Sequence, residues 1–128
     1  MDITTHRGEG TLQQVIEIGP HRVLSDVPLA SGGQGSAPEP HDLLAAALAA
    51  CTALTVTMYA RRKGYQLDDI AVSIQHGQEG GAYVLNRSIR YIGALAEDEK
   101  ARLTEIANKC PVHKTLSGQI QIRTQVSP

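Results

Sequence analysis

The segment HDLLAAALAACTALTVTMYARRKG, residues 41–64, predicts one long helix with almost no polar face. Pro40 suits the first turn of this helix, Asp42 favours its positive end, and Gly64 is a natural stop. A helix that is apolar on every side is either buried or spans a membrane. A span needs about 20 consecutive apolar residues. This run is near the lower limit, is rich in Ala and contains three threonines, so burial is favoured.

Complete burial of this helix needs more cover than a short chain offers. The sequence has 128 residues, and we predict a single domain over residues 1–128. Such a chain has little mass left to surround a central helix, whereas a second copy would supply it. We therefore expect a homodimer with the two long helices in or near a shared core. The alternative is a monomer whose sheet and second helix cover different faces.

The rest of the chain predicts an α+β fold with mostly antiparallel sheets around the buried helix. A glycine- and proline-rich loop fills residues 27–40. An amphipathic helix over residues 97–110 turns Leu103, Ile106 and Ala107 inward, and a short helical turn begins at Pro111. The predicted strands are 11–18, 21–26, 67–77, 80–95 and 119–126.

Bulk composition excludes several classes of partner. The formal net charge is −1 and no basic stripe is present, which disfavours nucleic acid and anionic membranes. There are four tyrosines and no Phe or Trp, which disfavours single-stranded nucleic acid. The N-terminus lacks a cationic lead and apolar run, so we predict a cytoplasmic protein with reduced thiols. The favoured interpretation of the sequence involves no cofactor and no metal.

The chain has two cysteines, Cys51 in the long helix and Cys110 immediately before Pro111. A buried mid-helix cysteine is commonly inert, whereas Cys110 at an N-cap would have its thiolate stabilised by free backbone N–H groups. From local physics alone Cys110 is the more acidic thiol. Two other hypotheses stay open at this point. One is a zinc site of Cys51, Cys110, His113 and His41, and the other is a hydrolase with a Cys nucleophile and His113 as base.

Several motifs in their order resemble the OsmC/Ohr family of thiol-dependent peroxidases, in its general OsmC-like branch. They are SDVP at residues 25–28, the glycine loop, PHDLL at 40–44, the AxxAAC segment ending at Cys51, and CPVHKTL from Cys110. The resemblance covers essentially the whole chain. It implies an interlocked homodimer with two central helices and active sites at the dimer interface.

The resemblance also implies a reaction and its residues. Cys51 would attack an organic hydroperoxide and become a sulfenic acid, and Cys110 would condense with it to a disulfide. A dithiol, such as a lipoylated protein, would reduce that disulfide. This assignment reverses the local expectation that Cys110 is the primary nucleophile.

One departure from the family pattern concerns thiol activation. The peroxidase branches usually place a Glu ten residues before the first Cys and pair it with an Arg, whereas this sequence has His41 there. Asp42 would substitute for the Glu or favour the helix N-terminus, and Arg22 or Arg7 would supply the cation. A dimer that only senses redox state or binds a small apolar ligand is the alternative to a peroxidase.

Overall fold

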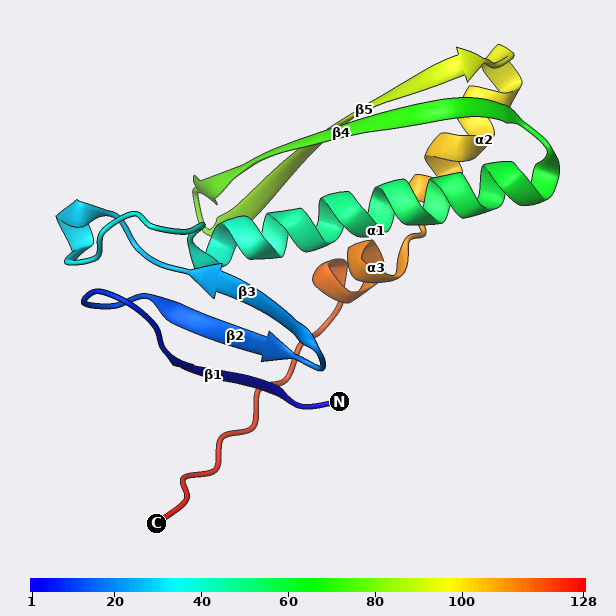
Figure 1. The fold of residues 1–128 in the computed structure, drawn as a ribbon. Coiled ribbons are helices and arrows are strands. Elements are labelled where there is room, and N and C mark those ends of the chain that lie inside the picture. Colours follow the sequence, from blue (N-terminus) through cyan, green and yellow to red (C-terminus); the bar gives the residue numbers. More distant parts are fainter. The chain divides into compact units, whose positions relative to one another are not determined.

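The computed structural model describes residues 1–128, and its elements confirm the predicted α+β class (Figure 1). In chain order they are β1 (Ile3–Arg7), β2 (Gln14–Ile18), β3 (His21–Ser25), the 3-10 turn η1 (Leu29–Ser31), α1 (Pro40–Lys63), β4 (Gln66–Glu79), β5 (Ala82–Ala94), α2 (Glu97–Ala107) and α3 (Pro111–Ser117). Both sheets are antiparallel. Residues Met1–Leu44 and Ala45–Pro128 form two units, which are described separately.

The first unit is a three-stranded meander in the order β1-β2-β3. The predicted hairpin of β2 and β3 is present, with Ile18 opposite His21 and Gly19 in the left-handed region at φ 56°. The sequence reading missed β1. Its five residues are all exposed, so they carry none of the apolar alternation from which a strand is recognised.

The glycine-rich loop after β3 is organised by one carboxylate. Asp26 is buried and accepts hydrogen bonds from the backbone N–H of Val27, Gln34 and Ser36 and from the Ser36 hydroxyl. Gly33 lies so close that a Cβ there would be 2.2 Å from the Val27 carbonyl oxygen. The loop therefore needs an acceptor at its centre and a residue without a side chain beside it.

The long helix α1 forms as predicted and ends at Gly64. The Gly64 N–H donates to Arg61 O at 3.3 Å and the Tyr65 N–H to Ala60 O at 2.9 Å, with Gly64 at φ 73°. This is a Schellman termination, which requires the left-handed residue. By length and composition α1 is long and apolar enough to cross a membrane, but buried core helices meet the same criteria. The hairpin beside it has open strand edges, which hydrocarbon would not satisfy, so we treat α1 as a core helix.

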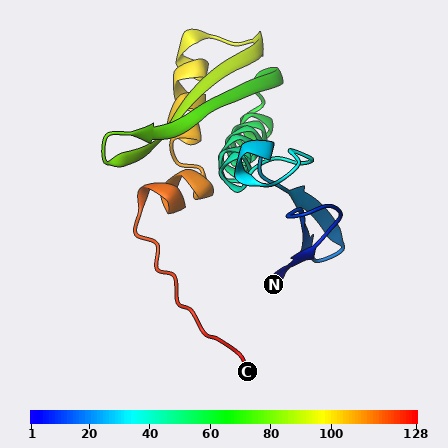
Figure 2. The same ribbon diagram turned by 90° about the vertical axis from the view of Figure 1, so that its left-hand side faces the viewer.

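The second unit packs a long hairpin and α2 against the C-terminal half of α1. Figures 1 and 2 both show β4 and β5 lying alongside this helix. The hairpin turns at Gly80, and the predicted inward row of Ile70, Val72 and Ile74 is half-buried while its neighbours are exposed. The buried core consists of Val56, Tyr59, Ala60, Leu103 and Ala107.

Burial of α1 within the chain is one-sided rather than complete. The buried residues of α1 are Ala45, Leu48, Thr52, Val56, Tyr59 and Ala60. Leu54 and Met58, by contrast, are 63% and 61% exposed. The single chain therefore leaves an apolar face of its most hydrophobic helix in contact with solvent.

The predicted strand over residues 119–126 is wrong for the single chain. The structure assigns no helix or strand after Ser117, and the two views show this tail running away from α3. Ile120, Ile122 and Val126 are 55%, 88% and 87% exposed. The alternation in this segment is real, but a strand forms only where a neighbouring strand supplies hydrogen-bonding partners, and no strand of this chain pairs with it.

The Asp26 carboxylate should make the stability of the fold depend on pH. Hydrogen bonds from the Ser36 hydroxyl and from backbone N–H groups lower the pKa of Asp26 from 3.8 to about 2. A lowered folded-state pKa stabilises the fold above the unfolded value of 3.8, and this stabilisation is lost as pH falls through about 2. Asp26→Asn should therefore unfold at a lower temperature than wild type at neutral pH. This gap between the two unfolding temperatures should narrow between pH 4 and pH 2.

Thermal unfolding followed by circular dichroism from pH 7 to pH 2 measures this gap. Asp2→Asn, which removes an exposed carboxylate of the same unit, is the matched control and should follow wild type throughout. A gap for Asp26→Asn that stays constant over the whole range would contradict this account of the loop.

Candidate thiol redox site

Cys51 lies in the middle of α1, half-buried, and is contacted by the start of α3. Its Sγ accepts a hydrogen bond from the Val112 backbone N–H at 3.4 Å, and the Thr55 hydroxyl lies 3.8 Å away. Thr55 follows one helical turn after Cys51, whereas Val112 is brought from a distant part of the sequence. The fold thus aims a free N–H group of the first turn of α3 at the helix thiol.

Cys110 is fully buried and caps the N-terminus of α3, as its place before Pro111 predicted. Its Sγ accepts the His113 backbone N–H at 3.4 Å, and the Thr52 hydroxyl lies 3.9 Å away. Both cysteines are free thiols. Cys110 lies near Cys51 and is one of the groups that lower the pKa of the Cys51 thiol. Two sulfurs from distant sequence positions therefore meet on one side of α1.

The pKa of the Cys51 thiol reflects a competition between burial and hydrogen bonding. Burial raises the pKa, but the hydrogen bonds from the Val112 N–H, the Thr55 hydroxyl and the Cys110 thiol together lower it below its ordinary value. The lowering comes from hydrogen bonds and not from a neighbouring cation. The contacts that lower the pKa of Cys51 include one from a distant part of the sequence, which local sequence physics did not reveal.

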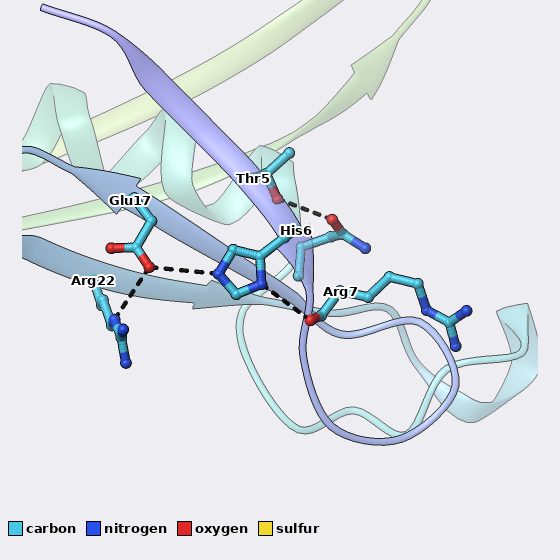
Figure 3. Close-up of polar contacts among 6 residues, drawn as sticks. Thr5, His6, Arg7, Glu17 and Arg22 are labelled. Atoms are coloured by element: carbon cyan, nitrogen blue, oxygen red, sulfur yellow. Dashed lines mark hydrogen bonds and ion pairs between the residues drawn. The ribbon is translucent and has the colours of Figure 1, made fainter.

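The cations named from the sequence make their contacts inside the first unit. Arg22, on β3, pairs through its Nε with Glu17 at 3.2 Å, and His6 approaches the same carboxylate (Figure 3). Arg7, on β1, donates to the Thr11 carbonyl at 3.1 Å. The role of Arg22 at the thiols stays a prediction.

Asp42 has a clear local function at the start of α1. One oxygen of its carboxylate accepts the Glu39 backbone N–H at 3.0 Å. This satisfies a backbone donor near the helix N-terminus and places negative charge at its positive end. A role for Asp42 in catalysis stays a prediction.

Sequence reasoning missed Arg87, a cation that the fold brings into contact with Thr52, the neighbour of Cys51. Arg87 lies on β5 and donates to Thr52 Oγ1 at 3.0 Å, to the Ala107 carbonyl at 3.4 Å and to Asn108 Oδ1 at 2.7 Å. Arg87 thus contacts Thr52, which is the neighbour of Cys51, and the C-terminal end of α2, which precedes Cys110. The alternation of inward and outward residues along the strand could have identified it, because Arg87 occupies an inward position between Leu85 and Ile89.

The structure does not contain the contacts that the two other hypotheses from the sequence, a zinc site and a Cys–His hydrolase, require. No group of three or more His, Cys, Asp or Glu side chains is arranged to hold a metal ion, so Cys51, Cys110, His113 and His41 do not form a zinc site. His113 approaches Cys110 through its backbone N–H, and no hydrogen bond joins its imidazole to either sulfur. A Cys–His hydrolase therefore lacks its nucleophile–base contact.

Comparison with known proteins identifies the family. The model for OsmC-like proteins matches residues 33–125, a span that includes both cysteines. The chain belongs to the OsmC-like family. Comparison with curated proteins found no match. The resemblance stated from the two cysteine motifs is thus confirmed, together with the α+β OsmC-like fold.

Solved structures of this family share the fold at low sequence identity. An OsmC-like protein of Mycoplasma pneumoniae is 21% identical, with a TM-score of 0.77 over 91% of this chain and 86% of the other. The organic hydroperoxide resistance protein OsmC of Legionella pneumophila is 22% identical, with a TM-score of 0.66 over 91% and 88%. A Vibrio cholerae protein assigned to organic hydroperoxide resistance, with captopril bound in one of its active sites, is 26% identical, with a TM-score of 0.61 over 92% and 85%.

Removal of the Thr55 hydroxyl should shift the ionisation of Cys51. Thr55→Val keeps the shape of the side chain but removes one hydrogen bond that lowers the pKa of Cys51. The midpoint of the pH dependence of Cys51 alkylation should therefore move to higher pH. Iodoacetamide labelling across pH, with the Cys51 peptide quantified by mass spectrometry, measures it.

Thr57→Val provides the control, because Thr57 is another half-buried threonine of α1 that makes no hydrogen bond to the thiol. Its alkylation profile should match that of wild type. Coincident profiles for Thr55→Val and Thr57→Val would show that the Thr55 contact does not influence the thiolate.

Proposed function

We propose that this chain is a thiol-dependent peroxidase that reduces organic hydroperoxides. The observation that carries the proposal is the adjacent pair of free thiols in which the pKa of Cys51 is lowered by hydrogen bonds from α3 and Thr55. Membership of a family that contains hydroperoxide resistance proteins supports it. Captopril, found in an active site of the Vibrio cholerae relative, is itself a thiol, which fits a site that exchanges with thiols.

The chemistry divides into two balanced steps. The Cys51 thiolate attacks the outer oxygen of the hydroperoxide, the O–O bond breaks, and the alkoxide leaves as an alcohol after taking up a proton, which leaves Cys51 as a sulfenic acid. The Cys110 thiol then attacks the Cys51 sulfur, water leaves, and a disulfide forms. A dithiol, for which a lipoylated protein is our candidate, reduces the disulfide and restores both thiols. A cytoplasmic setting suits this cycle because thiols stay reduced there.

The proposed roles can be separated with single substitutions. After one equivalent of cumene hydroperoxide, wild type should lose both thiols and form a Cys51–Cys110 disulfide. Cys110→Ser should stop at the sulfenic acid on Cys51, because the second sulfur that displaces water is missing. Intact-mass and peptide mass spectrometry with dimedone trapping distinguish these products.

Cys51→Ser is the matched control, and its Cys110 thiol should survive the same treatment. Retention of a free Cys51 in wild type, under conditions that fully oxidise a known thiol peroxidase, would rule out the proposed function. Disulfide formation that no dithiol reverses would favour a redox sensor instead.

We further propose that two copies associate through the exposed face of α1. Leu44, Ala47, Cys51, Leu54 and Met58 recur at alternating spacings of three and four residues, which is the pattern of a helix–helix seam. Four of these residues are exposed and Cys51 is half-buried among them. The apolar alternation of the unpaired C-terminal tail suits addition to a sheet of the second copy. A second copy would thus place each Cys51 beside the dimer interface.

A charge placed on this face should separate the copies. Ala47→Glu puts a carboxylate in the centre of the apolar seam, where a dimer would have to bury it unpaired. We expect wild type to be dimeric and Ala47→Glu to be largely monomeric by size-exclusion chromatography with light scattering. Ala101→Glu, which changes an exposed alanine of α2, should stay dimeric. A monomeric wild-type chain would contradict the proposal.

A further inference from the structure

A pocket of about 370 Å³ lies in the second unit on the β5 side of α1. Three leucines supply its apolar wall, and Arg87 and His113 supply its polar groups together with two hydroxyl side chains. The lining residues are Leu48, Tyr83, Leu85, Arg87, His113, Leu116 and Ser117. Each is held by a regular element, since they come from α1, β5 and α3. The pocket is therefore formed by helices and a strand that belong to the second unit.

The guanidinium of Arg87 is the unusual group in this pocket. It is half-buried, and the oxygens it contacts belong to a hydroxyl, a backbone carbonyl and an amide, all of which are neutral. It forms no ion pair, and no Asp or Glu lines the pocket. Removing a cation from water without an opposite charge is unfavourable, so the pocket holds an unbalanced positive charge beside an apolar wall.

The contacts of Arg87 also fix its orientation. Hydrogen bonds to Thr52, on α1, and to Ala107 and Asn108, at the end of α2, hold the planar group between two elements. They use three of its five N–H donors. The guanidinium is thus pre-oriented and retains donor capacity. A fixed guanidinium suits a carboxylate, which it can bind through two parallel hydrogen bonds.

We propose that this pocket binds an amphiphilic monocarboxylate. The carboxylate lies against Arg87 and His113, and the aliphatic chain lies along Leu48, Leu85 and Leu116. One guanidinium balances one negative charge, which favours a carboxylate over a phosphate dianion. The apolar wall favours an aliphatic chain over a hydrophilic acid. This binding property does not depend on turnover at Cys51, so it stands or falls separately from the proposed peroxidase activity.

Isothermal titration calorimetry with octanoate on the full-length Cys51→Ser protein tests the proposal. This background prevents oxidation chemistry, so its outcome is distinct from the peroxide experiment. We expect saturable binding of one octanoate per chain, and weak or undetectable binding of octanol, which has the chain but no charge. Octyl phosphate should bind less tightly than octanoate.

Substitutions assign the binding to the named residues. Arg87→Met should weaken octanoate binding about tenfold or more, because a charge-assisted hydrogen bond is lost. Arg90→Met is the matched control, since Arg90 is an exposed arginine of the same strand outside this pocket, and it should bind like the parent. Leu116→Ala removes part of the apolar wall without touching the contacts of Arg87, and it too should weaken binding.

Leu116→Ala keeps the test informative if Arg87→Met fails to fold, which circular dichroism would show. Absence of saturable octanoate binding would overturn the proposal. Equal binding of octanol and octanoate, or tighter binding of octyl phosphate, would overturn the assignment of a carboxylate. Unchanged affinity in a folded Arg87→Met or in Leu116→Ala would overturn the assignment of the pocket.

Discussion

The constraint on which the structure depends is the burial of α1. Its residues are apolar in every direction, so water is unfavourable on all its sides. The hairpin of β4 and β5 and the helix α2 cover one side, where Val56 and Leu103 are fully buried. The opposite side carries Leu54 and Met58 into solvent. The helix that closes the core of one chain thus also exposes an apolar surface to solvent.

The thiol site follows from this arrangement because the half-buried Cys51 lies beside Thr52, which is on the covered side of α1. Thr52 is fully buried next to Cys51, and it contacts both the Cys110 sulfur and the guanidinium of Arg87. The N-terminal turn of α3 then supplies backbone N–H groups to both sulfurs. Hydrogen bonds in a partly desolvated place are strong enough to outweigh the effect of burial on the pKa of Cys51. The positive charge nearest in this network belongs to Arg87, which contacts Thr52.

Prediction from the sequence succeeded where the signal was local. The bounds of α1, the inward residues of α2, the hairpin at Gly80 and the capping position of Cys110 were all readable from periodicity, glycine and proline. It failed for the exposed strand β1, and for the tail at residues 119–126, whose alternation lacks a partner in this chain. It also did not reveal the hydrogen bond from Val112 to Cys51, because that contact joins residues far apart in sequence.

What the sequence determined by itself was most of the helices and strands and the two cysteine motifs, since helix periodicity, turn chemistry and capping act over a few residues. What only the tertiary structure decided was which groups meet. The pairing of Cys51 with the start of α3 and the placement of Arg87 against Thr52 depend on how β5 and α3 pack on one face of α1. Contacts of that kind are set by packing across the core, and no short stretch of residues specifies them.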